Sequence, residues 1–136
     1  MQLNAYVFFN GSCEEALEHY REALGGEIQI NRYEGSPGAA MAPSDWGNKV
    51  MHGRLVSPAG TLMAADTSGD HWHSNKGENF SLSVETTTEA EADAVFTKLS
   101  AGGAVTMPMA KTFWGAKFGM LVDRFGIKWM VNCPLG

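Results

Sequence analysis

Hydrophobic positions follow two different periods along this chain. Short runs rich in aromatic and β-branched residues predict strands, and apolar positions three and four residues apart predict two helices. One helix runs from Ser12 to about Leu24, and the other follows Thr88; a Gly-Gly pair ends each of them. The predicted strands lie at residues 3–9, 27–33, 49–56, 61–66, 79–85, 104–107, 117–122 and 127–133.

The helix starts and one strand end carry local signals. Ser12 with Glu15, and Thr88 with Glu91, have the spacing of a capping box, in which each side chain bonds to the backbone of the other residue. Pro108 lacks a backbone N–H, so it either ends the strand at 104–107 or places it at a sheet edge.

The same pattern occurs twice. Leu-Val, a three-residue turn and Gly stand at residues 55–60 and again at 121–126. In the second copy, Asp123 is expected to bond to its own backbone and Gly126 to adopt positive φ. Each half reads as strand, helix and three strands, and the first half is longer by a loop at residues 35–48.

This repeat predicts the architecture. We expect one α+β domain over residues 1–136, with module 1 at about 1–68, a linker at about 69–77 and module 2 at about 78–136. Two βαβββ modules side by side would form a curved mixed sheet around a cleft, with the helices outside. The 35–48 loop is either a lid, a partner contact or a mobile loop.

Composition narrows the classes of partner. Of the 136 residues, 44% are hydrophobic and 18% charged, which is typical of an ordered globular protein. The net charge is −5 and the ten basic residues are scattered, so neither nucleic acid nor an anionic membrane is an expected partner. No signal-peptide pattern or long apolar run occurs, which predicts a soluble, cytoplasmic protein.

The two cysteines, Cys13 and Cys133, have no Cys-x-x-Cys spacing and predict free thiols in a reducing compartment. Cys13 stands at a predicted helix start, where the helix dipole would lower its pKa. The alternative is that it is simply a small, half-buried residue.

Several longer stretches together resemble one superfamily across nearly the whole chain. They are Tyr-Val-Phe-Phe-Asn-Gly-Ser-Cys-Glu-Glu-Ala-Leu (6–17), Gly-Gly-Glu-Ile (25–28), Val-Met-His-Gly (50–53), Leu-Met-Ala-Ala-Asp (62–66), Thr-Phe-Trp-Gly (112–115) and Asp-Arg-Phe-Gly-Ile-Lys-Trp-Met-Val-Asn (123–132). These stretches resemble the vicinal oxygen chelate superfamily of glyoxalase I, bleomycin-resistance proteins and extradiol dioxygenases, and most closely its PhnB-like branch. The fold hosts many chemistries, so the resemblance leaves the activity open.

The metal enzymes of that superfamily take ligands from the first and last strand of each module. Carried over by motif, these positions fall on Asn4 (or Ala5), Asn79, Met130 and Ala64 (or Met63). None is His, Asp or Glu, the ligands that hard or borderline divalent metals need. The resemblance therefore implies a chain without the glyoxalase-type metal centre, and we expect no metal and no cofactor.

Among the histidines, His52 is the candidate for chemistry. It lies in a predicted strand beside Gly53 and would serve as a general base or a polar anchor in the cleft. A nearby Asp66 carboxylate would orient its ring and raise its pKa. The alternative is a hydrogen-bonded core histidine. His71-Trp72-His73 falls on the polar linker and is read as an exposed loop, and His19 lies off the helix's apolar stripe and is read as solvated.

Aromatic side chains supply the candidates for ligand binding. Glycines around Trp114 and Phe118 would let a partner approach closely, although Trp114 is equally consistent with packing beneath a bend. Trp129 belongs to a periodic strand and is read as core. The expected ligand-binding residues near the cleft are Tyr6, Phe8, Trp46, Trp114, Phe118 and Met130.

Three classes of function follow. The first is a metal-independent protein that binds a small organic ligand as a homodimer, as the resemblance to drug-sequestering proteins implies. The second is a metal-independent lyase or isomerase that uses His52 and Asp66, and the third is a partly degenerate protein with only an assembly role. A glyoxalase-like metalloenzyme is the least expected. PhnB-like chains have been labelled ubiquinone-pathway methyltransferases, but no Gly-x-Gly-x-x-Gly loop occurs here.

Overall fold

The computed structural model of the chain describes residues 1–68 and 79–136. The chain divides into two compact units, Met1–Ser74 and Asn75–Gly136. The predicted linker at 69–77 lies outside the described residues. The predicted cleft depends on how the two modules are placed relative to each other, so the cleft stays a prediction.

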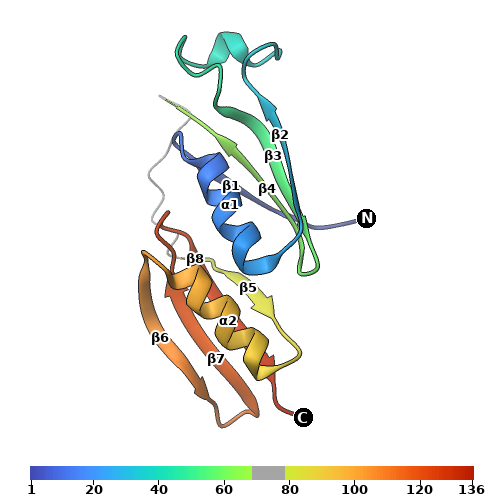
Figure 1. The fold of residues 1–136 in the computed structure, drawn as a ribbon, viewed down its shortest axis with the longest axis vertical. Helices are drawn as coiled ribbons and strands as arrows, with labels where there is room; N and C mark the ends of the chain where they lie inside the picture. The colour runs from blue at the N-terminus through green and yellow to red at the C-terminus, as the bar shows by residue number, and fades with distance from the viewer. Residues whose placement is uncertain (69–78) are drawn as a thin grey trace. The chain divides into compact units, whose positions relative to one another are not determined.

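The first unit has the order strand, helix, three strands (Figure 1). Strand β1 pairs in parallel with β4, and β3 joins β4 and β2 by antiparallel pairing, so the sheet order is β1-β4-β3-β2. A short 3₁₀ turn, η1, lies in the long loop between β2 and β3. The elements are β1 (Ala5–Phe9), α1 (Cys13–Leu24), β2 (Glu27–Arg32), η1 (Ala39–Met41), β3 (Val50–Ser57) and β4 (Gly60–Asp66).

The second unit repeats this topology. Its sheet has the order β5-β8-β7-β6, again with one parallel pair, β5 with β8. The α+β class and the two βαβββ modules are thus confirmed. The elements are β5 (Leu82–Glu85), α2 (Glu89–Ser100), β6 (Ala104–Lys111), β7 (Ala116–Val122) and β8 (Lys128–Pro134).

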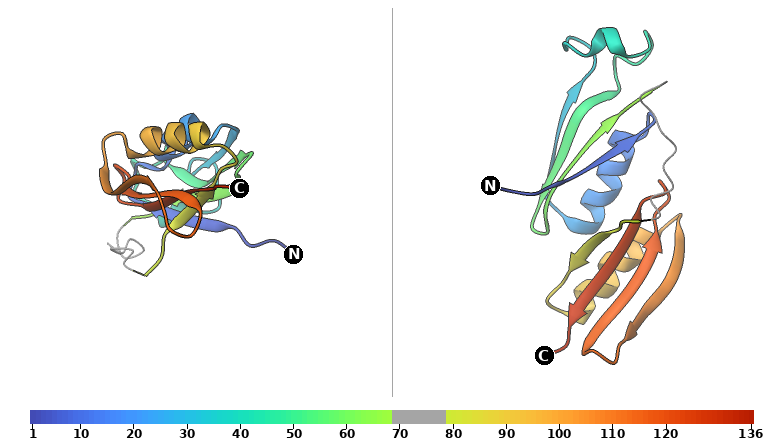
Figure 2. Two further views of the ribbon diagram at one scale, coloured as in Figure 1. Left: turned by 90° about the horizontal axis from the view of Figure 1, so that it is seen from below. Right: turned by 180° about the vertical axis from the view of Figure 1, so that it is seen from behind.

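In each unit the helix covers one face of the sheet (Figure 2). Alternate strand residues point toward that helix and form the core, because successive side chains of a strand lie on opposite faces. Trp129, predicted as core, is 3% exposed. The other face of each sheet carries half-buried or exposed side chains, including Tyr6 and Phe8. The core of the two units includes Val7, Phe9, Leu17, Tyr20, Leu55, Val84, Phe96, Leu99, Leu121, Trp129 and Val131.

The two helix starts differ from each other. The Thr88 side chain accepts a hydrogen bond from the Glu91 backbone N–H at 3.1 Å, as predicted. Ser12 makes no side-chain capping bond, so the capping box predicted there is wrong. Its place is taken by Asp66, whose carboxylate reaches the start of α1 from the end of β4.

Strand β6 decides between the two alternatives for Pro108, a strand end or an edge strand. This strand continues through Pro108 to Lys111, so the reading that Pro108 ends it is wrong and the reading of an edge strand is confirmed. The pairing with β7 shifts register between Met107 and Ala110, which accommodates the missing N–H.

The turn at 123–127 forms as expected. Asp123 Oδ1 accepts the backbone N–H groups of Phe125 and Ile127, and Asp123 Oδ2 accepts the Trp129 indole N–H at 2.9 Å. Gly126 has φ +87°, a conformation that other residues rarely adopt. Among the described helices, none is both long and apolar enough to cross a membrane.

Two predictions about α1 are corrected. His19 was expected to be solvated, but it is 9% exposed and its ring lies 5.9 Å from that of Tyr20. Cys13 is completely buried, and burial, followed by the nearby Asp66 carboxylate, raises its pKa well above the usual value. The reading of a thiol activated by the helix dipole is therefore wrong, and the reading of a small buried residue holds.

Candidate functional site

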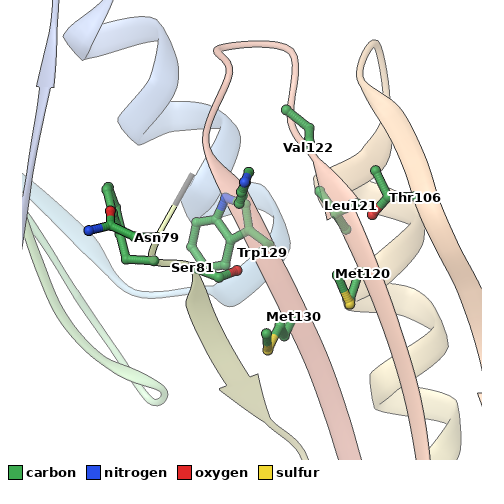
Figure 3. Close-up of a pocket in the computed structure, with 10 residues that line it drawn as sticks. Asn79, Ser81, Thr106, Met120, Leu121, Val122, Trp129 and Met130 are labelled. Carbon is green, nitrogen blue, oxygen red and sulfur yellow. The ribbon is translucent and has the colours of Figure 1, made fainter. Parts of the chain in front are cut away.

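The open face of the second sheet carries a pocket of about 460 Å³ (Figure 3). Its volume lies within the usual range of small-molecule sites, roughly 300–1,000 Å³. The residues that line it come from the segment before β5 and from strands β6, β7 and β8. They are Asn79, Phe80, Ser81, Thr106, Met120, Leu121, Val122, Lys128, Trp129 and Met130.

Strand register explains which side chains form the floor of this pocket. Met120 on β7 pairs with Met130 on β8, and Val122 pairs with Lys128 two residues further along. Because paired residues point to the same face, these four side chains lie together on the face opposite α2. Figure 3 shows Met120 and Met130 on neighbouring strands.

The polar groups of the pocket are few. Asn79, Ser81 and Thr106 contribute an amide and two hydroxyls, and Lys128 contributes an ammonium group. No Asp or Glu is among the residues that line this pocket. The site thus combines flexible thioether side chains with a single cation and three hydrogen-bonding groups.

The open face of the first sheet carries a different group of side chains. The hydroxyl of Tyr6 on β1 lies 2.9 Å from Nδ1 of His52 on β3, at hydrogen-bonding distance. The rings of Tyr6 and Phe8 lie 5.0 Å apart, and both side chains are exposed, 38% and 53% respectively. Burial raises the pKa of Tyr6 above its usual value of 10.0, so the phenol keeps its proton at neutral pH.

Asp66 has a different role from the one predicted. Its carboxylate is 1% exposed; Oδ1 accepts the backbone N–H groups of Gly11 and Cys13, and Oδ2 accepts that of Val50, at 2.8–3.1 Å. Both oxygens are thereby used in holding the start of α1 and of β3. His52 is hydrogen-bonded to Tyr6 instead. The expectation that Asp66 orients the His52 ring does not agree with these hydrogen bonds.

The remaining aromatic candidates are not among the residues that line the pocket. Trp114 and Phe118 are in contact at the β6–β7 hairpin, with ring centroids 5.9 Å apart, and Trp114 is 57% exposed. Trp46, in the loop between β2 and β3, lies beside Tyr33 with centroids 6.3 Å apart. Of the predicted ligand-binding residues, only Met130 lines the pocket. The His-x-His at 71–73 falls outside the described residues.

Sequence reasoning missed the other nine lining residues, among them Phe80, Ser81, Thr106, Met120 and Lys128. A usable signal existed for two of them. Once Trp129 is taken as core, the two-residue period of strands 117–122 and 127–133 places Lys128 and Met130 on the other face, and Met120 opposite Met130. The segment at 79–81 belongs to the strand predicted at 79–85, but β5 begins only at Leu82, so the strand period does not place these side chains.

The donor set on these faces does not fit the metal centre that the superfamily resemblance implies. Met63 pairs with Tyr6 and Met130 pairs with Ser83, so Met63 rather than Ala64 is the counterpart of Met130. Thioethers are poor ligands for the hard and borderline divalent metals of such centres. Within residues 1–68 and 79–136, no group of three or more His, Cys, Asp or Glu side chains lies close enough to hold a metal ion.

A family model and a protein from Escherichia coli both match nearly the whole chain. Residues 2–132 match the model of a family described as 3-demethylubiquinone-9 3-methyltransferase. Protein YjdN of Escherichia coli (strain K12) is 26% identical over 144 residues, which covers 97% of this chain and 95% of the relative.

Two solved structures are similar over their whole length. Protein PA1353 from Pseudomonas aeruginosa is 40% identical with a TM-score of 0.86, covering 100% of this chain and 99% of its own. A structure from Bacillus cereus, described as a putative 3-demethylubiquinone-9 3-methyltransferase, PhnB protein, is 30% identical with a TM-score of 0.77 and full coverage of both chains. At the level of fold alone, a glyoxylase/bleomycin resistance protein/dioxygenase domain from Frankia sp. EAN1pec is 14% identical with a TM-score of 0.67, covering 98% of this chain and 92% of its own.

Proposed function

Since the chain belongs to the family described as 3-demethylubiquinone-9 3-methyltransferase, in its PhnB-like branch, we propose that it is a small-molecule-binding protein that works without a metal ion. The observation that carries this proposal is the open pocket of about 460 Å³ on the second sheet. Its floor of Met120 and Met130 offers apolar contact, while Asn79 and Thr106 offer hydrogen bonds that orient a ligand.

Thioether side chains suit such a binding role. Methionine is flexible and polarisable, so Met120 and Met130 adapt to ligands of different outline and contact aromatic rings favourably. Each Å² of apolar surface that a ligand removes from water contributes about 25 cal/mol before the costs of association are subtracted. Methyl transfer, which the family's description names, is no part of the proposal, because the printed sequence has no Gly-x-Gly-x-x-Gly loop for a methyl-donor nucleotide.

A thermal-shift panel tests the proposal. The panel contains antibiotics, other aromatic compounds and divalent metal ions, each added to the full chain. A ligand at a hundredfold excess over its Kd stabilises the folded state by about 2.7 kcal/mol, which raises Tm by several degrees. We expect organic compounds to raise Tm and metal ions to leave it unchanged. Strong stabilisation by metals alone would overturn the proposal.

Two matched variants locate the binding. Met130→Glu places a carboxylate in the pocket floor. Val105→Glu places one on the edge strand β6, where the side chain is 50% exposed, does not line the pocket, and pairs with the core residue Leu121 rather than with the pocket floor. We expect Met130→Glu to abolish the shifts given by the organic compounds and Val105→Glu to retain them. Equal loss in both variants would place the binding elsewhere.

A second candidate is a metal-independent lyase or isomerase, which the Tyr6–His52 hydrogen bond favours. Here His52 acts as a general base on the open face of the first sheet, and Tyr6 rather than Asp66 is its partner. Its test is turnover of a substrate found through the panel. His52→Ala should lower kcat by roughly 10²-fold or more, and unchanged turnover would exclude His52 as the base.

A further inference from the structure

We propose that the pocket on the second sheet selects organic anions: molecules with an apolar, ring-containing body and one carboxylate- or sulfonate-type group, whose charge is met by Lys128. The inference rests on the proposed function, because it names the class of ligand for the same pocket.

The side chains that line the pocket carry positive charge and no negative charge. Lys128 is the single charged residue that lines it. In the part of the chain that the structure describes, Arg32 is paired with Glu14, and Lys117 with Asp93 and Glu89, whereas Lys128 has no ion pair. An ammonium group that faces a pocket without a carboxylate is free to pair with a bound anion.

The position of Lys128 places its charge beside the apolar floor. Lys128 pairs with Val122, and Met130 follows two residues later on the same face of β8. The lysine stem is apolar and packs along such a surface while its ammonium end stays in water. A ligand body over Met120 and Met130 would therefore hold an anionic group within reach of Lys128.

The neighbouring polar groups suit the same class of ligand. The pocket offers hydrogen-bond donors in the hydroxyls of Ser81 and Thr106 and the amide of Asn79. Carboxylate and sulfonate oxygens accept hydrogen bonds from such donors. Hydrogen bonds to an ionised group are shorter and stronger than those between neutral groups. A neutral ligand gains the apolar contact but not these charge-assisted bonds, so the pocket distinguishes the two by charge.

Two fluorescent probes with one body test this inference on the full chain. They are 1-anilinonaphthalene-8-sulfonate and 1-anilinonaphthalene, which differ only in the sulfonate. Lys128→Met removes the charge and keeps the length of the side chain; Lys128→Gln is a second, polar version. The control is Lys98→Met, the same change on the exposed surface of α2.

We expect Lys128→Met to raise the Kd of the sulfonate probe roughly fivefold to tenfold and to leave that of the neutral probe within about twofold. Lys98→Met should change neither. Added salt should raise the Kd of the sulfonate probe for the unmodified protein, because salt screens a half-exposed charge pair. The same salt should have less effect on the Kd for Lys128→Met.

If the probes bind, any of three results would overturn the inference. They are an unchanged Kd for the sulfonate probe in both Lys128 variants, equal weakening of both probes, or an effect of Lys98→Met as large as that of Lys128→Met. If neither probe binds, the inference also fails, whereas the proposed function is decided separately by the thermal-shift panel with Met130→Glu and Val105→Glu. Binding of both probes with no effect of Lys128 would leave the proposed function standing without the preference for anions.

Discussion

Asp66 is the residue whose role is clearest and least predictable from sequence. It is 1% exposed, and its carboxylate accepts three backbone N–H groups from two separate segments, at Gly11 and Cys13 and at Val50. One of these bonds satisfies the Cys13 N–H in the first turn of α1, where unpaired N–H groups and the helix dipole favour a negative charge, and another satisfies Gly11 just before the helix. The strand pattern predicted that Asp66 ends β4, but which backbone it bonds to depends on contacts between distant segments.

Replacement of Asp66 is expected to destabilise the first unit. Asp66→Asn keeps one acceptor oxygen and turns an NH₂ group toward a backbone N–H, so we expect the free energy of unfolding to fall by about 2–4 kcal/mol. Asp45→Asn, in the exposed part of the 35–48 loop, is the control and should change it by less than about 0.5 kcal/mol. Urea unfolding measures both. An Asp66→Asn protein of normal stability would contradict this structural role.

The buried thiol of Cys13 predicts how stability depends on pH. Burial, and then Asp66, raises its pKa above the ordinary value of 9.0, so the folded chain keeps this proton at a pH where the unfolded chain loses it. The stabilisation is present below pH 9 and is lost as the pH rises further. Between pH 9 and 10 we expect the free energy of unfolding to fall by at most about 1.4 kcal/mol per pH unit from this group.

Urea unfolding at several pH values measures this slope, and Cys13→Ala should make it shallower. The comparison uses slopes rather than absolute stabilities, because loss of the sulfur itself leaves a small cavity. The same slope in both proteins would show that Cys13 does not cause the loss of stability at high pH.

At the scale of elements, local signals in the sequence predicted most of the structure. Within residues 1–68 and 79–136, the two-residue and helical periods located all eight strands and both helices to within a few residues, because each element buries one face and exposes the other. The Ser12 capping box and the end of a strand at Pro108 were wrong for a shared reason. In both cases a contact from another element, the Asp66 carboxylate or the β7 ladder, outweighs the local preference.

The Gly-Gly pairs that follow both helices have a role in packing. A Cβ added at Gly103 would collide with the Val122 carbonyl oxygen and the Asp123 backbone, and one at Gly26 would collide with the Val56 carbonyl oxygen. The chain enters β6 and β2 against the end of the neighbouring strand, so the glycine is required by the close approach of two backbones. The repeat in sequence thus marks a repeated tertiary contact.

Gly103→Ala tests this contact. Because the collision is with backbone atoms, we expect a loss of about 2 kcal/mol or more in the free energy of unfolding. At Gly47 the nearest atom to an added Cβ is Glu34 Cβ at 3.4 Å, an ordinary contact, so Gly47→Ala should cost less than about 0.5 kcal/mol. Thermal unfolding compares the two variants, and equal costs would refute the role given to Gly103.

At the scale of the whole molecule, the two units share one topology but differ in the chemistry of their open faces. Tyr6, Phe8 and His52 occupy the first, whereas Met120, Met130 and Lys128 occupy the second. The sequence predicted the repeat and the fold. It did not predict the pocket, because the lining side chains come from four separate segments whose register is set only when the sheet forms.

The superfamily resemblance also leads us to propose a homodimer. Closed two-fold assemblies are the commonest form of soluble oligomer. Sedimentation of the full chain should give about twice the mass of the 14.7 kDa chain at micromolar concentration. A single species of monomer mass at that concentration would contradict the dimer, and it would leave the pocket within one unit unaffected.

The most direct test of metal-independent binding is a crystal structure of the protein grown with the compound that gives the largest thermal shift. The account predicts ligand density over Met120 and Met130, beside Asn79 and Thr106, with no metal ion between ligand and protein. A ligand held through a divalent metal, or one bound away from this pocket while Met120 and Met130 stay free, would contradict it.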